Sequence, residues 1–284
     1  MTGIDGGLDD PERALLAELA ARHGLGSSDD ARAVARGAEN TTFAIGEWIV
    51  RRSDDLDSVA REVALLRRLA RATRVPVPVP VVHEVDAGIM VYRRLPGEPL
   101  LARRRAVDVG RALIDVLGTL RRIHADLPFD DVPIEEWHDE AVRHFGVVRP
   151  HLDAAQAATV AAFLESPPPP PGVRVVALHN DLGAEHILAD AGGRVTGVID
   201  WTDAARADPA RDLGTIFRDL GPSIARQVGE ALEGPLTDGD LARMRFHGRC
   251  TWLEDLEFAI SDLDGRTAYR TNAWATFDRT FRDP

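Results

Sequence analysis

The residues with the clearest chemistry lie on the two sides of one turn. Asp181 and His186 precede residues 190–194, Asp-Ala-Gly-Gly-Arg, and Asp200 follows them. A Gly-Gly pair flanked by Asp and Arg is typical of the tight turn of a hairpin. A hairpin folded about this turn makes His186 and Asp200 neighbours, with Asp181 in the loop that enters it. The sequence therefore predicts that two potential metal ligands and a third carboxylate converge.

This set of residue types suits phosphoryl transfer. The reaction needs a metal ion that bridges the nucleotide phosphates and a carboxylate that orients the attacking hydroxyl group. Asp200 supplies the hard oxygen ligand that Mg²⁺ prefers, and His186 is a second candidate ligand. Asp181 is the candidate catalytic residue that accepts the hydroxyl proton. A metal-dependent hydrolase that uses His179, Asp181, His186 and Asp200 is the alternative enzyme class.

Composition excludes several other functions. The chain has 284 residues, enough for one large domain or two lobes, and its net charge of -12 disfavours binding to nucleic acid or anionic membranes. All 34 basic residues are arginine, which excludes a Schiff-base lysine and a lysine-bearing P-loop. The single cysteine, Cys250, excludes an internal disulfide. No apolar run reaches the ~18 residues of a membrane span, and we expect a cytoplasmic protein.

Hydrophobic periodicity predicts an α+β protein in two parts. The first third reads as a helix, an antiparallel meander, a second helix and a further strand, at residues 11–23, 31–52, 59–70 and 88–93. The remainder is mainly helical, with helices at 106–124, at 153–164 and from 212 onward, and strands at 173–178, 187–189 and 195–199. We place the boundary of the two lobes at 95/96, giving a small lobe at 1–95 and a larger one at 96–284.

The ordered motifs resemble the aminoglycoside phosphotransferase family, whose fold is that of protein kinases. The family pattern H-x-D-x4-N, I-D-W and D-P-x-x-D-L is matched by His179-x-Asp181-x4-His186, by residues 199–201 and by residues 208–213. Histidine at 186 replaces the usual asparagine, as in some 2''-phosphotransferases and macrolide phosphotransferases. The resemblance implies a bilobal kinase-like fold, ATP or GTP as phosphate donor, and Mg²⁺. It also implies that His179 supports the catalytic loop, and we expect Asp212 to cap a helix.

The same resemblance implies a nucleotide site in the first lobe. Arg51 takes the place of the phosphate-pairing lysine and pairs with Glu62, while a hinge strand presents Tyr92, Arg93 and Leu95 to the base. A guanidinium can clamp phosphate oxygens and still pair with a carboxylate. A tyrosine at position 92 favours guanine in relatives, so GTP is a candidate beside ATP. Residues 37–40 are expected to cover the phosphates.

Acidic side chains beside an aromatic ring point to a cationic acceptor. Trp252, Glu254 and Glu257 lie on one predicted helix, and 254 and 257 share a face. A second acidic run, residues 135–140, is expected to line the same cleft. We therefore expect a monomeric antibiotic phosphotransferase that acts on a small cationic molecule, most simply an aminoglycoside. A macrolide or another antibiotic as acceptor, or a non-catalytic kinase-like binding protein, are the alternatives.

Overall fold

The computed structural model describes residues 7–37, 40–102, 106–262 and 266–282. Its first part is a five-stranded antiparallel sheet in the order β1-β2-β3-β5-β4. The antiparallel meander and the strand near 88–93 are as predicted from the sequence, whereas the strand order and the strand at 80–84 were not predicted. The elements of this part are α1 (Asp10–His23), β1 (Arg32–Arg36), β2 (Asn40–Ile45), β3 (Trp48–Ser53), α2 (Leu56–Ala72), β4 (Pro80–Glu84) and β5 (Ile89–Arg93). The tip of the turn between β1 and β2, residues 38–39, lies outside the described residues, so the expected phosphate-covering loop is not described.

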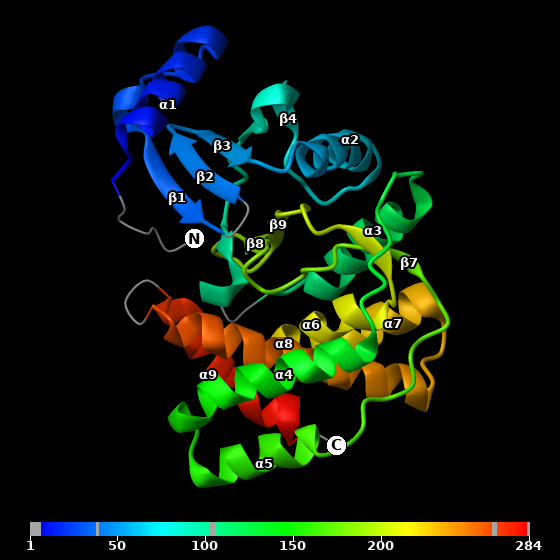
Figure 1. Ribbon diagram of the computed structural model, residues 1–284. Helices are drawn as coiled ribbons and strands as arrows, with labels where there is room; N and C mark the ends of the chain where they lie inside the picture. The colour runs from blue at the N-terminus through cyan, green and yellow to red at the C-terminus, as the bar shows by residue number, and fades with distance from the viewer. Residues whose placement is uncertain (1–6, 38–39, 103–105, 263–265, 283–284) are drawn as a thin grey trace.

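The two helices of this part cover opposite faces of the sheet (Figure 1). Leu16 and Leu19 of α1 pack with Phe43 and Val50 on one face. The α2 helix begins at the cap Asp55, whose side chain accepts a hydrogen bond from Ser58 N, and buries its apolar side against the other face. Because the sheet is covered on both sides, side chains on its strands hold fixed positions at the edge that faces the rest of the molecule.

The second part is mainly helical, with short strands. Its elements are β6 (Glu98–Pro99), α3 (Val109–Arg122), α4 (Ile134–Val148), α5 (Ala154–Leu164), β7 (Val176–Leu178), β8 (Ile187–Ala189), β9 (Val195–Val198), β10 (Ala205–Ala207), α6 (Ala210–Leu220), α7 (Pro222–Glu233), α8 (Asp238–Ile260) and α9 (Thr267–Phe281). The α+β class with an antiparallel first part and a helical second part is confirmed. The division of the chain at 95/96 stays a prediction. Close to this boundary, between β5 and β6, Gly97 has a φ of 101°, a backbone conformation that favours glycine.

Three local predictions were wrong. The helix α4 was not expected. Its buried residues, Ile134, Ala141 and Val148, are seven positions apart, and the acidic residues between them obscure the helical periodicity. The strand predicted over 173–178 is shortened to β7, and its partner β10 was missed. Three-residue strands carry too few alternating positions to be recognised from periodicity.

The short strands matter because they position the loops between the two parts. The hairpin β8–β9 pairs with β6 in a three-stranded sheet, and β7 pairs with β10. Figure 1 shows β8 and β9 between the five-stranded sheet above and the helices α6 and α8 below. The segments 179–186 and 199–204 therefore emerge at the junction of the two parts. In the described part of the chain, no helix is long and apolar enough to cross a membrane.

Candidate active site

Asp181 lies on a loop whose backbone is held from behind. The N–H groups of His179 and Asn180 donate to the two carboxylate oxygens of the buried Asp212, at 3.1 and 2.9 Å. Asn180 has φ 68°, which reverses the chain there, and its amide donates to Asp130 Oδ2 at 2.9 Å. These contacts leave the Asp181 side chain half-exposed and turned toward the junction.

The structure tests the supporting roles expected for His179 and Asp212. His179 is fully buried and its Nε2 donates to Ile199 O at 3.0 Å, which agrees with a supporting role. The hydrolase alternative needs His179 as a ligand and conflicts with this burial. The expectation that Asp212 caps a helix was wrong: it lies inside α6, and Asp208 accepts from Ala210 N at the start of that helix instead.

His186 stands between the two acidic side chains. Its Nδ1 donates to the backbone oxygen of Asp181 at 2.8 Å, and its Nε2 lies 3.6 Å from Asp200 Oδ2. The predicted convergence is confirmed, although the register differs by one residue, because Ile199 N donates to His186 O. Burial lowers the pKa of His186, but the charges of Asp181 and Asp200 outweigh it and raise that pKa to about 9.

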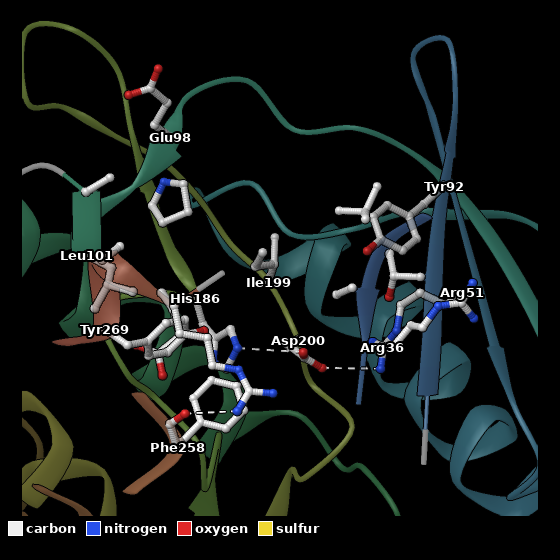
Figure 2. Close-up of a pocket in the computed structure, with 18 residues that line it drawn as sticks. Arg36, Arg51, Tyr92, Glu98, Leu101, His186, Ile199, Asp200, Phe258 and Tyr269 are labelled. Carbon is white, nitrogen blue, oxygen red and sulfur yellow. Dashed lines mark hydrogen bonds and ion pairs between the residues drawn. The ribbon is translucent and has the colours of Figure 1, made fainter. Parts of the chain in front are cut away.

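Arg51 and Glu62 form a buried ion pair on the other side of Asp200 from His186. Arg51 Nη1 donates to Glu62 Oε1 at 2.8 Å, and both side chains are almost completely buried. Arg51 Nη2 lies 3.3 Å from Asp200 Oδ1 and also donates to Thr202 Oγ1. The paired prediction of Arg51 with Glu62 is therefore matched in the structure. Figure 2 shows Asp200 between His186 on one side and Arg51 on the other.

The two aspartates differ in their electrostatics. Burial favours a high pKa for Asp200, but Arg51 and then His186 outweigh it and hold the pKa at about 2. For Asp181, burial and then the negative charges of Glu185 and Asp203 outweigh the effect of His186 and raise the pKa. Asp200 is therefore a fixed anion, whereas Asp181 is suited to accept a proton.

His186 and Asp200 fit a divalent cation. Because Nδ1 of His186 donates to a backbone carbonyl, Nε2 is the nitrogen that would bind a metal ion, which would displace the proton that the neighbouring carboxylates favour there. The 3.6 Å between Nε2 and Asp200 Oδ2 lets one ion contact both at the ~2.0–2.1 Å typical of Mg²⁺. Asp181, Glu185 and His186 also offer ligand atoms that lie within 4.8 Å of one another.

A cavity of about 420 Å³ is lined by Arg51, His186 and Asp200. Asp181 does not line this cavity but lies 3.5 Å from His186, which does. The sheet side of the cavity is lined by Val34, Thr42, Arg51 and Tyr92, and its helical side by Glu185, His186, Phe258 and Tyr269. Ile199 and Asp200 lie between the two sides (Figure 2). The cavity is thus a cleft with one wall from the sheet and one from the second part.

The predicted hinge residues lie where the sheet meets this cleft. Tyr92 is buried against the cavity, and burial raises the pKa of its phenol, so the hydroxyl stays neutral. Leu95 lies over Gly197, with no room between them for a side chain at 197. The side chain of Arg93 turns outward to Glu47. The N–H of the next residue, Arg94, already donates to Glu47 O.

The predicted acceptor residues lie outside this cleft. Trp252 is fully buried, and its indole donates to Ala273 O between α8 and α9, so its ring offers no face to a small molecule. Glu254 is exposed and Glu257 pairs with His144 of α4 at 2.7 Å; neither lines the cavity. The acidic run at 135–140 belongs to α4 and does not line it either. The expected role of Trp252 as an aromatic face for the acceptor was wrong, whereas acceptor binding by Glu254, Glu257 and residues 135–140 stays a prediction that their absence from the cavity lining does not support.

Sequence reasoning missed two residues that hold the site. Thr202 accepts from Arg51, and its hydroxyl lies 3.2 Å from both Glu62 Oε2 and Asp200 Oδ1. Asp219 of α6 is buried and accepts from Ala184 N at 2.8 Å, which fixes the turn before His186. Thr202 follows the Ile-Asp-Trp motif directly, which is a usable signal, whereas nothing local marks Asp219.

The arrangement is that of a protein-kinase-like phosphotransferase. The structure of the GDP complex of wild-type aminoglycoside 2'-phosphotransferase-IIIa is similar, with a TM-score of 0.64 at 18% identity, covering 97% of this chain and 99% of that one. Viomycin phosphotransferase of Streptomyces vinaceus is 27% identical over 201 residues, 64% of this chain and 69% of the relative. The Bacillus subtilis (strain 168) protein YcbJ, described as uncharacterized, is 60% identical over 36 residues, only 12% of its length. Residues 30–247 match the phosphotransferase enzyme family, and the chain belongs to that family.

Proposed function

We propose that the protein transfers the γ-phosphate of ATP or GTP to a hydroxyl group of a small cationic antibiotic, with an aminoglycoside as the first acceptor to test. The observation that carries this proposal is that Arg51, His186 and Asp200 line one cleft, with Glu62 paired to Arg51 and Asp181 3.5 Å from His186. Family membership and the likeness to viomycin phosphotransferase support an antibiotic as acceptor.

The nucleotide would lie on the sheet side of the cleft. Its base would pack near Tyr92 and bond to the backbone of residues 93–95, apart from the N–H of Arg94 that Glu47 occupies. Arg51 would donate to phosphate oxygens while Glu62 and Thr202 keep its guanidinium in place. Mg²⁺ held by His186 and Asp200 would neutralise charge on the phosphates.

On the other side, Asp181 would accept a hydrogen bond from the acceptor hydroxyl and take its proton. In this step the acceptor oxygen forms a bond to the γ-phosphorus, the bond from that phosphorus to the β–γ bridging oxygen breaks, and the nucleoside diphosphate leaves. The raised pKa of Asp181 suits it to hold that proton. We further propose that the protein works as a cytoplasmic monomer.

The test is phosphate transfer from labelled ATP or GTP, with Mg²⁺, to kanamycin, viomycin and erythromycin. We expect label on at least one acceptor, and loss of that label in Asp181→Ala. Nucleotide binding without transfer to any acceptor would support a non-catalytic binding protein and contradict the proposal. Parallel titrations of ATP and GTP decide between the two donors.

A further inference from the structure

Glu185 is the one residue between the catalytic loop and the metal-binding histidine whose role the mechanism leaves open. It sits on a turn closed by a hydrogen bond from His186 N to Gly183 O at 3.1 Å. The preceding residue, Ala184, has both backbone groups bonded: its N–H to Asp219 Oδ2 and its oxygen to Leu101 N. The position of the Glu185 side chain is therefore set by the fold.

One oxygen of the Glu185 carboxylate makes no hydrogen bond. This atom, Oε2, is buried and has no hydrogen-bond partner among the residues that the structure describes. The nearby guanidinium of Arg218 is used on Asp219, on Asp255 and on a backbone oxygen. His186 is engaged with Asp181 and Asp200. A buried polar atom without a hydrogen-bond partner lowers the stability of the folded protein by about 1–3 kcal/mol, so a bound ligand that supplies the missing hydrogen bond is one explanation for such an atom.

The surroundings of Glu185 suit a cation. Glu185 lines the 420 Å³ cavity on the same side as the rings of Tyr269 and Phe258. Burial and then the negative charge of Glu185 raise the pKa of Tyr269, so a neutral phenol stands near the carboxylate. A carboxylate beside an aromatic ring binds ammonium or guanidinium groups through charge and through the ring face.

Glu185 is close enough to Asp181 for one small molecule to contact both. Ligand atoms of Asp181 and Glu185 lie within 4.8 Å of each other. With hydrogen bonds of about 2.8 Å to the two oxygens, a hydroxyl group on Asp181 and a nitrogen on Glu185 lie no more than about 10 Å apart. A single small acceptor can therefore carry both groups.

On the basis of the proposed function, we propose that Glu185 is a specificity-determining residue that binds a cationic nitrogen of the same acceptor molecule that presents its hydroxyl group to Asp181. The acceptor class is therefore an amino or guanidino alcohol. This assignment replaces Glu254 and Glu257, which do not line the cleft.

The test compares acceptors with and without the cation. Kanamycin, viomycin and erythromycin are each assayed untreated and, for the two with primary amines, after N-acetylation. For the acceptor that the wild type phosphorylates, we expect Glu185→Gln to raise KM about 10- to 100-fold, the range for a lost hydrogen bond to a charged group, with kcat little changed. Glu185→Asp should recover part of the loss. The matched control is Glu136→Gln, an exposed glutamate of α4, which should leave KM unchanged.

Three results would overturn the inference. An unchanged acceptor KM in Glu185→Gln, with transfer intact, contradicts this role alone. Weaker binding of Mg²⁺-nucleotide to Glu185→Gln in calorimetry without acceptor would make Glu185 a metal ligand instead. No transfer by the wild type to any acceptor would overturn the proposed function and this inference together. Melting temperatures of both glutamine variants check that they are folded.

Discussion

The two walls of the cleft treat buried charge in opposite ways. On the sheet side, Arg51 and Glu62 are paired at 2.8 Å and tied further to Thr202 and Asp200. On the helical side, one oxygen of Glu185 is buried with no hydrogen-bond partner among the described residues. The comparison teaches that the sheet side is preorganised by its own ion pairs, whereas the helical side keeps a polar atom for a ligand or carries it at a cost.

Asp181→Ala should give the largest effect, because it removes the group that meets the acceptor without touching the paired wall. We expect kcat to fall by ~10²–10⁴-fold, the usual contribution of a positioned base. The affinity for Mg²⁺-nucleotide should stay unchanged. Steady-state kinetics and calorimetry measure the two quantities separately.

Asp200→Ala should differ from Asp181→Ala in its effect on nucleotide binding. It should lose Mg²⁺-dependent nucleotide binding and turnover together, because Asp200 joins His186 to Arg51. If Asp181→Ala lowers nucleotide affinity as much as Asp200→Ala does, then nucleotide binding does not depend on the sheet side alone.

Arg51→Ala tests how strongly the sheet wall depends on pairing. It leaves Glu62 as an unpaired buried charge, so we expect the free energy of unfolding to fall by about 3–5 kcal/mol in urea denaturation. Arg51→Lys should keep much of that stability, since an ammonium can still pair with Glu62, but lose the second contact to Asp200 or Thr202.

The matched control is Arg52→Ala on the same strand. Arg52 is half-exposed and lies 3.7 Å from the fully exposed Asp54, so its removal should change stability by less than about 0.5 kcal/mol. Equal losses in the two alanine variants would contradict a special role for the buried pair.

His247 of α8 lies away from this cleft, against Trp137, and its Nδ1 is also buried with no hydrogen-bond partner among the described residues. It tests through pH what such a buried polar group costs. Burial lowers its pKa to about 3, with Arg211 adding to the effect. The unfolded chain binds a proton near pH 6.5 and the folded one does not, so stability is present above pH 6.5 and is lost as pH falls toward 3. His247→Phe should remove about 1.4 kcal/mol per pH unit of that loss between pH 6 and 4.

Urea denaturation at several pH values measures this slope. The exposed His151 gives the control variant, His151→Phe, which should keep the wild-type slope. If His247→Phe and the wild type lose stability in parallel, the buried imidazole is not the source of the pH dependence.

The sequence predicted the residues of one side of the cleft better than those of the other. The hairpin around residues 190–194 is local, so its turn chemistry alone predicted that His186 and Asp200 meet. Its register was off by one: Ile187 pairs with Val198 and Leu188 with Gly197, so Ile199 rather than Asp200 lies opposite His186. Arg51 and Glu62 were found because ordered motifs extend along the first part of the chain.

The acceptor wall was not predictable, because it depends on how α8 and α9 pack. Trp252 reads equally well as a surface platform or as a core residue, and the structure buries it against Phe277 and Phe281. Spacing says which residues share a helix face but not which face turns to the core. Tertiary packing decides that, and it places Glu185 rather than Glu254 beside Asp181.

Glu254→Gln should give the smallest effect and completes the comparison. Glu254 is exposed and does not line the cleft, so acceptor KM and kcat should both stay within about twofold of the wild type, as for an ordinary surface substitution. Glu257→Gln should behave likewise in kinetics, although it loses the contact to His144. Kinetics of both variants beside Glu185→Gln, with the same acceptor and nucleotide, rank the three glutamates. A rise in acceptor KM for Glu254→Gln that exceeds the rise for Glu185→Gln would restore the helix α8 as the acceptor surface, because the cleft geometry alone would then fail to identify the residues that bind the acceptor.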